Sequence, residues 1–262
     1  MTRTEKDFLG AREIPDDAYY GVQTLRGKEN FHITGIPMSA EPFFVKAFGY
    51  VKKAAALANR DLGVLDARIA NAIVAACDRL IAGEMRDQFV TDFIQGGAGT
   101  STNMNANEVI ANLALEALGH GKGEYHVVNP NDHVNFGQST NDVYPTAFRL
   151  ALILRLTAYM DSLSRLMDAF HAKAAEFDRV LKMGRTHLQD AVPMTLGQEF
   201  HGWGRRSARK CIASRKCARC CTRSTSAPPR SAPRSRRTQA IRSLRPAIFP
   251  RSPAPSSSSP ET

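Results

Sequence analysis

The chain has 262 residues, of which 43% are hydrophobic and 23% are charged, a composition that excludes collagen-like, mucin-like and wholly disordered proteins. The formal net charge of +10 is uneven: residues 205–262 carry 13 Arg and 2 Lys against one acidic residue, whereas residues 1–204 carry a net charge of −4. No apolar run reaches the roughly 18 residues of a membrane span, and the charged N-terminus lacks a signal-peptide pattern. We therefore expect no membrane partner, and the single cysteine of residues 1–204, Cys77, favours a reducing, cytoplasmic setting.

Helical periodicity dominates residues 1–204. Segments with apolar residues at steps of three and four are residues 42–60, 66–82 and 105–118. The longest such pattern follows Asn141 and Asp142, has Pro145 in its first turn and runs to about residue 180, which is typical of a bundle helix. Short strand patterns are confined to residues 14–35 and 125–128. The sequence thus predicts a mainly α protein without a parallel sheet.

The composition changes abruptly after Gly204. All 18 glycines precede this point, whereas 8 of the 14 prolines and 4 of the 5 cysteines follow it. The Arg-, Ser- and Pro-rich remainder has too few large apolar residues to offset its ordering entropy. We predict an N-terminal domain over residues 1–141, the beginning of a central helical bundle over 142–204, and a disordered basic tail over 205–262.

Four polar clusters interrupt the helical patterns. They are residues 95–105, 129–135, 138–142 and 184–194. In the first, three glycines let the backbone approach an anion, and the following helix offers free N–H groups near Thr100. A nucleotide loop is excluded because no strand–helix–strand unit and no Gly-Lys-Ser/Thr run accompany it. A tight turn followed by a helix cap is an equal alternative.

The third and fourth clusters contain short donors and one histidine. Ser139, Thr140 and Asn141 are residue types that cap helices, but one cap needs only one of them, which favours a binding role. A lone histidine such as His187 is more often structural than catalytic, although its neighbour Thr186 favours a site. The histidines of residues 1–204 are too scattered for metal ligation, so we expect no metal centre.

Together, the clusters resemble the aspartase/fumarase superfamily. The resemblance spans residues 4–203 and includes the segment Tyr20–Arg26 and the segment Lys182–Phe200. The runs Gly-Gly-Ala-Gly-Thr-Ser and Ser-Thr-Asn-Asp are similar to the ammonia-lyase version. Class II fumarases, which typically have Ser-Ser-Asn-Asp and Ser-Gly-Thr runs, are the alternative. The resemblance implies an N-terminal helical domain followed by a long-helix central bundle, of which this chain carries only the start.

The resemblance also implies a reaction, the elimination of ammonia from L-aspartate to give fumarate through an aci-carboxylate carbanion. Residues at the matching positions are expected to bind substrate, and they are Thr100, Ser139, Thr140, Asn141, Thr186, His187 and Arg26. His187 is the one candidate catalytic group. Family members form homotetramers whose sites combine three subunits. They need no organic cofactor, and magnesium activates some of them.

The sequence departs from this family in two ways. It lacks the Gly-Ser-Ser loop that carries the serine base, so we expect the chain to be an inactive fragment. The Arg/Ser/Pro tail is unrelated to the family, and we hypothesise a frameshift. Nucleic-acid binding through the tail is the alternative of another class, but Phe249 is its one aromatic residue for base stacking. We expect no specific nucleic-acid partner, and we expect the four tail cysteines to be exposed, unstructured thiols.

Overall fold

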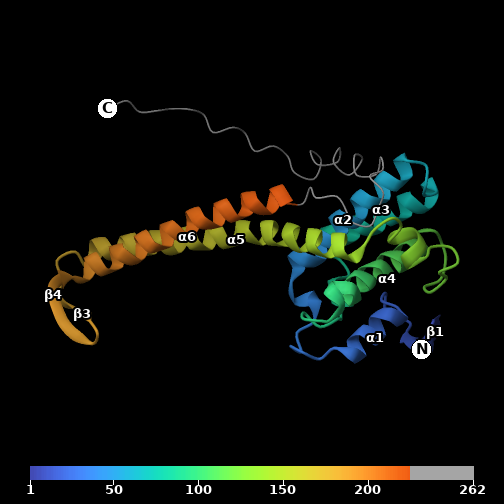
Figure 1. Cartoon of the computed structure of the whole chain (residues 1–262), viewed down its shortest axis with the longest axis horizontal. Helices are drawn as coiled ribbons and strands as arrows, with labels where there is room; N and C mark the ends of the chain where they lie inside the picture. Colours follow the sequence, from blue (N-terminus) through green and yellow to red (C-terminus); the bar gives the residue numbers. More distant parts are fainter. Residues whose placement is uncertain (225–262) are drawn as a thin grey trace. The chain divides into compact units, whose positions relative to one another are not determined.

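The computed structural model describes residues 1–224, with side chains through Cys217 (Figure 1). These residues form two compact units, of which the first covers residues 1–147 and the second begins at Phe148. Helices make up most of both units, which confirms the prediction of a mainly α protein. No helix in the described part is both long and apolar enough to cross a membrane.

The first unit begins with an antiparallel hairpin. Strand β1 (Thr2–Asp7) pairs with β2 (Gly10–Pro15), and Gly10 adopts a φ of +117°, which favours glycine at the tight connection. The predicted strand segments were wrong, because most of 14–35 is not extended and residues 125–128 form no strand.

Helix α1 (Val22–Asn30) occupies the middle of the segment predicted to be extended. Its N-terminus is held by two carboxylates from distant parts of the sequence, because Glu5 accepts the N–H of Val22 and Glu108 accepts that of Gln23. Such long-range capping has no local sequence pattern, which explains why the helix was missed.

Helices α2 (Pro42–Asp61) and α3 (Ala67–Ala82) pack against each other as an antiparallel pair and confirm the predicted helical segments. The Asp66 side chain caps α3 by accepting two backbone N–H groups, and Gly83 ends it in the left-handed region with a φ of +100°. Gly49 lets α2 approach α3 closely, because a Cβ there would lie 2.9 Å from the Ile81 side chain.

Helix α4 (Thr100–Ala117) is the central helix of the first unit, and every residue from Thr102 to Leu115 is buried. It begins five residues earlier than the 105–118 pattern, inside the glycine-rich cluster. Gly99 makes this start feasible, because its φ is +85° and a Cβ there would collide with the Tyr144 ring. The helix therefore carries polar residues of the cluster into the core.

Helix α5 (Thr140–Glu176) runs from the first unit into the second, as the long periodic pattern predicted. Pro145 lies in its second turn rather than its first. A proline there has no N–H for the carbonyl of Asn141, so the first turn of α5 is only partly stabilised by its own backbone. The chain enters the helix through η4 (Pro130–Val134), a turn of π-helix capped by the Asn129 side chain.

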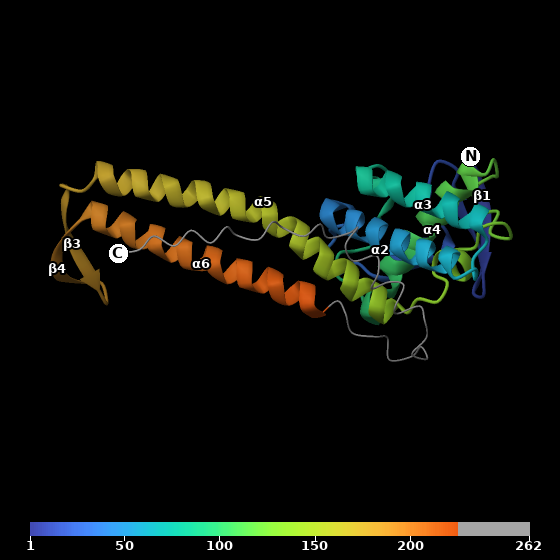
Figure 2. The same cartoon turned by 90° about the horizontal axis from the view of Figure 1, so that it is seen from above.

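The second unit is a helical hairpin. In Figures 1 and 2 the later part of α5 runs beside α6 (Leu196–Ser224), and β3 (Leu181–Thr186) and β4 (Gln189–Thr195) connect them. Phe170 of α5 contacts Trp203 of α6 with ring centroids 5.9 Å apart, and Phe200 meets Trp203 edge to face within α6 at 4.9 Å. The strands were not predicted, because their turn residues are His-Leu rather than Asn-Gly.

Helix α6 corrects the predicted start of the tail. Residues 205–224 were expected to be disordered, but they continue α6 without a break. Neither glycine nor proline occurs between Gly204 and Pro228, and the Ala, Arg and Lys residues there are good helix formers. Cys211 and Cys217 are therefore helical rather than unstructured. The remaining tail prediction concerns residues 225–262, which lie outside the described residues.

Candidate functional site

The predicted polar residues of the first unit lie at the starts of α4 and α5. Thr100 is the first residue of α4, is exposed, and donates from Oγ1 to the Gly97 carbonyl at 2.6 Å. Ser139 precedes α5, and its Oγ accepts the N–H of Asn141 at 3.3 Å. This hydrogen bond is the helix cap that the alternative interpretation predicts. Of the three side chains of Ser139, Thr140 and Asn141, it engages only that of Ser139.

Asn103 joins the first, second and third clusters. Its Nδ2 donates to Asn135 Oδ1 and to Thr140 Oγ1, each at 3.2 Å. Its Oδ1 is buried and has no hydrogen-bond partner among the described residues, as is also true of Asn107 Oδ1 one turn along α4. An unsatisfied buried acceptor costs about 1–3 kcal/mol, so the position of this amide is not explained by stability alone.

Sequence reasoning missed Lys52, which lies beneath this network. Its side chain is fully buried on α2, and Nζ donates to Asn135 Oδ1 at 2.8 Å and to Gln138 Oε1 at 3.1 Å. A signal was present in the sequence, because Lys52 occupies a position on the apolar face of α2 between Phe48 and Ala55. A charged residue in such a position is unusual and points to a specific role.

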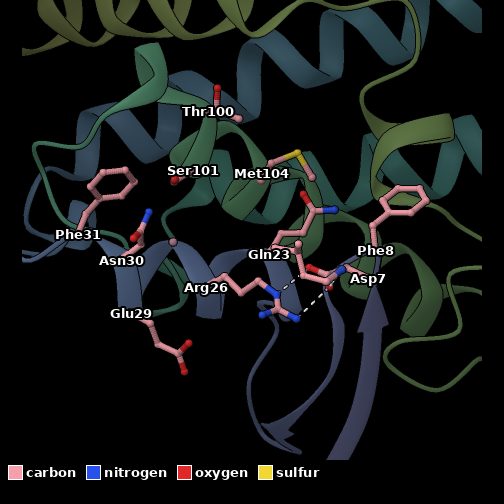
Figure 3. Close-up of a pocket in the computed structure, with 12 residues that line it drawn as sticks. Asp7, Phe8, Gln23, Arg26, Glu29, Asn30, Phe31, Thr100, Ser101 and Met104 are labelled. Atoms are coloured by element: carbon pink, nitrogen blue, oxygen red, sulfur yellow. Dashed lines mark hydrogen bonds and ion pairs between the residues drawn. The ribbon is translucent and has the colours of Figure 1, made fainter.

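A pocket of about 610 Å³ lies beside the N-terminus of α4 (Figure 3). Thr100 and Arg26 both line it, so the structure brings these two predicted residues to one cavity. Figure 3 shows the Arg26 guanidinium turned toward Asp7, with Nε 2.8 Å from Oδ2 and Nη2 3.0 Å from Oδ1. This bidentate pair holds the pKa of Asp7 below its usual value and neutralises much of the positive charge expected to steer substrate.

Glu108 fixes the helix that carries Arg26, and sequence reasoning missed it as well. The carboxylate accepts the backbone N–H groups of Gly21, Gln23 and Thr24 at 2.9–3.0 Å and the Thr24 hydroxyl at 2.5 Å. Burial raises the pKa of Glu108 to about 7, while the donors of α1 lower it. The residue therefore orients the start of α1 relative to α4.

Thr186 and His187 belong to the second unit, so the structure does not group them with the residues of the first. Both are exposed at the tip of the β3–β4 hairpin. His187 and Leu188 form its two-residue turn with φ of +51° and +64°. A backbone in this region is uncommon for such residues and often marks a functional segment.

Within residues 1–217 no group of three or more His, Cys, Asp or Glu side chains could hold a metal ion. The chemical character of the site is instead set by neutral donors at two neighbouring helix starts. Helix N-termini present free N–H groups and a positive partial charge, and hydroxyl and amide donors add to both. The arrangement is suited to binding an anion such as a carboxylate.

Comparisons with known proteins identify the family of this chain. A family model described as lyase matches residues 10–217. An aspartate ammonia-lyase from Pseudomonas fluorescens is 62% identical over 201 residues, covering 77% of this chain and 42% of the relative. One from Escherichia coli K12 is 57% identical over 202 residues, with the same two shares. The chain thus spans less than half the length of these relatives.

Solved structures give the same result. A fumarate lyase:delta crystallin from Brucella melitensis bound to cobalt is 48% identical with a TM-score of 0.84, covering 95% of this chain and 55% of that one. A recombinant class II fumarase from Schistosoma mansoni is 37% identical with a TM-score of 0.70, covering 81% and 44%. The chain therefore belongs to the lyase family, as a member of the aspartase/fumarase superfamily.

Proposed function

We propose that this chain carries part of an aspartate ammonia-lyase site, which eliminates ammonia from L-aspartate to give fumarate. The observation that carries the proposal is the pair of hydrogen bonds from Asn103 to Asn135 and Thr140, which ties the start of α4 to the start of α5. Identities near 60% to proteins named aspartate ammonia-lyase support the choice of substrate. By resemblance the enzyme is a carbon–nitrogen lyase.

In this proposal Thr100, Ser139, Thr140 and Asn141 bind the substrate carboxylates. Loss of the Cβ proton builds negative charge on the adjacent carboxylate, and fixed neutral donors stabilise that charge without having to reorganise. By resemblance, a complete site combines residues of three subunits, and in it Thr186 and His187 hold the other end of the substrate. Arg26 adds the positive charge that its ion pair with Asp7 leaves. The proposal requires no organic cofactor, and magnesium remains an activator to be tested.

We further propose that the 262-residue chain alone is inactive. The serine base is assigned by resemblance to a Gly-Ser-Ser segment, which its sequence does not contain. Losing a general base costs about 10² to 10⁴ in rate. Purified chain incubated with L-aspartate is expected to release no ammonia, and ammonia release that copurifies with the chain would contradict this part of the proposal.

A chimera tests the substrate assignment directly. Residues 1–203 are joined to the remaining part of the Pseudomonas fluorescens aspartate ammonia-lyase, and the product is assayed with L-aspartate and with L-malate. Ammonia release from aspartate, with no fumarate formed from malate, is the expected result. The second candidate is a class II fumarase, favoured by the likeness to the Schistosoma mansoni structure. Turnover of malate alone would establish that candidate instead.

The exposed face of the second unit supports assembly into an oligomer, which we propose to be a homotetramer. Leu152, Tyr159 and Leu166 are 39–47% exposed and lie seven residues apart along α5, so they form one apolar stripe. A heptad stripe of this kind is the usual packing surface of a helical bundle. The α6 helix adds Trp203, which is 43% exposed, and Ile212, which is 55% exposed.

A further inference from the structure

Lys52 is a buried cation without a carboxylate partner among the described residues. Its side chain is 0% exposed, and its Nζ contacts are the side-chain carbonyl oxygens of Asn135 and Gln138. Amide oxygens solvate an ammonium group but do not neutralise it. A buried charge held in this way is costly, so its presence calls for a compensating function.

The contacts of Lys52 lead directly to the proposed substrate-binding segment. Asn135 Oδ1, which accepts from Lys52, also accepts from Asn103 Nδ2, and the same Nδ2 donates to Thr140 Oγ1. Asn135 also donates from Nδ2 to the Gln138 carbonyl at 3.2 Å. The loop that these bonds brace continues without interruption into Ser139. The ammonium group therefore holds both ends of the connection from η4 into α5.

We propose, on the basis of the function proposed above, that Lys52 is a positioning residue for the dicarboxylate site. Lys52 braces the Asn135–Gln138 loop through its two hydrogen bonds. A carboxylate bound at residues 139–141 compensates the buried positive charge of Lys52. Binding of a dicarboxylate is then coupled to retention of the proton on Lys52, although Lys52 itself does not touch the ligand.

The surroundings of Lys52 make this coupling measurable. Burial lowers the pKa of Lys52 from its usual 10.5 to about 7. The Cys77 thiol of α3 is the titratable group that faces it, and burial raises the pKa of this thiol to about 12, so it is neutral near pH 7. Asp78 on the same helix is paired with the exposed Lys53 at 2.6 Å. An anion bound nearby stabilises the protonated lysine, so the complex takes up a proton above about pH 7.

The test is calorimetric titration of the full chain with succinate, an unreactive dicarboxylate, between about pH 6 and about pH 9. The wild-type affinity is expected to fall as the pH rises, by up to about tenfold per pH unit, and two buffers of different ionisation enthalpy should report proton uptake. Lys52→Met should bind succinate at least about tenfold more weakly at about pH 6 and show no such slope. The matched control is Lys53→Met, which should keep the wild-type profile.

The slope distinguishes coupling from a merely structural role, which would weaken binding equally at every pH. Wild-type binding without proton uptake, or a wild-type slope in Lys52→Met, overturns the inference while leaving the proposed function intact. If the wild-type chain binds no succinate at any pH, the proposed binding site is contradicted, and the inference about Lys52 is contradicted with it. If circular dichroism shows that Lys52→Met is unfolded, proton uptake by the wild-type chain decides the outcome.

Discussion

Glu108 accepts four hydrogen bonds from Gly21, Gln23 and Thr24 at the start of α1, and these donors favour its ionised carboxylate. Three of its donors, the N–H groups of Gly21, Gln23 and Thr24, belong to the set of unpaired N–H groups that every helix start must satisfy. Burial acts in the opposite direction and raises the pKa to about 7. One side chain thus joins the core of α4 to the helix that carries Arg26.

Substituting Glu108 with Gln tests this role. An amide presents an N–H where an acceptor oxygen stood, so at least one backbone N–H of α1 loses its partner. We expect the free energy of unfolding to fall by about 1–3 kcal/mol, measured by urea denaturation followed by far-ultraviolet circular dichroism. Glu84→Gln is the control, because Glu84 forms an exposed ion pair with Arg79 and such pairs contribute about 0–1 kcal/mol. Equal effects in the two variants would show that Glu108 is not an anchor.

Lys52 gives a pH dependence of stability whose sign follows from its lowered pKa. The unfolded chain keeps the lysine proton up to the usual pKa of 10.5, whereas the folded chain loses it at about 7. The unfolded state binds more protons between these values, so the free energy of unfolding rises with pH. Lys52→Met should remove this rise when urea unfolding is compared at about pH 7 and about pH 9. A rise of equal size in the variant would assign it to other groups.

Among the elements, the β3–β4 hairpin carries the clearest conformational strain. Leu188 has a φ of +64° and is 98% exposed, so no packing compensates for its left-handed backbone. A non-glycine residue in this region costs roughly 1–2 kcal/mol. His187, which precedes it, is held in the same turn, and strain retained beside a proposed substrate-binding residue is consistent with positioning of that residue.

Replacing Leu188 with Gly should therefore stabilise the second unit. We expect the free energy of unfolding to rise by up to about 1 kcal/mol, because the relief of strain exceeds the added flexibility of glycine in the unfolded chain. Leu181→Gly is the matched control, since Leu181 is 81% exposed but lies within strand β3, where glycine weakens the strand. Destabilisation by both substitutions would contradict the assignment of strain to the turn.

The helices also show how much of the structure the sequence predicts. The helices α2, α3 and α5 were predicted correctly because their apolar residues recur at helical steps. Ser139, Thr140 and Asn141 stay a prediction of binding residues, made because they form a dense polar run. Such local patterns cannot predict contacts between residues that are far apart in the sequence. Glu108 caps a helix that lies 84–87 residues earlier in the chain, and Lys52 donates hydrogen bonds to Asn135 and Gln138, which lie 83 and 86 residues later. Helix α6 was cut short because the Arg/Ser/Pro composition was applied to residues 205–224, which contain no proline.

At the scale of the whole molecule, the apolar stripe of α5 predicts self-association. We expect sedimentation velocity to show an oligomer of the wild-type chain, because Leu152, Tyr159 and Leu166 are exposed in the single chain. Changing Tyr159 and Leu166 together to Lys should shift the protein toward monomer, since charge on a bundle seam opposes burial. The control pair is Asp161→Lys and Asp168→Lys, elsewhere on the same helix. A monomeric wild-type chain would contradict the proposed assembly surface.

The central claim is that the donors at the starts of α4 and α5 bind the substrate carboxylates, and the effect of Thr140→Ala on the ammonia-lyase activity of the chimera tests it most directly. Removing one such donor is expected to lower kcat/KM for L-aspartate by about 10² to 10³. Thr146→Ala is the matched control, because its Oγ1 bonds the Asp142 carbonyl within the same helix, and it should stay within about twofold of the unmodified chimera. Unchanged kinetics in Thr140→Ala, and equally in Thr100→Ala and Ser139→Ala, would show that these residues serve only to cap and brace the helices.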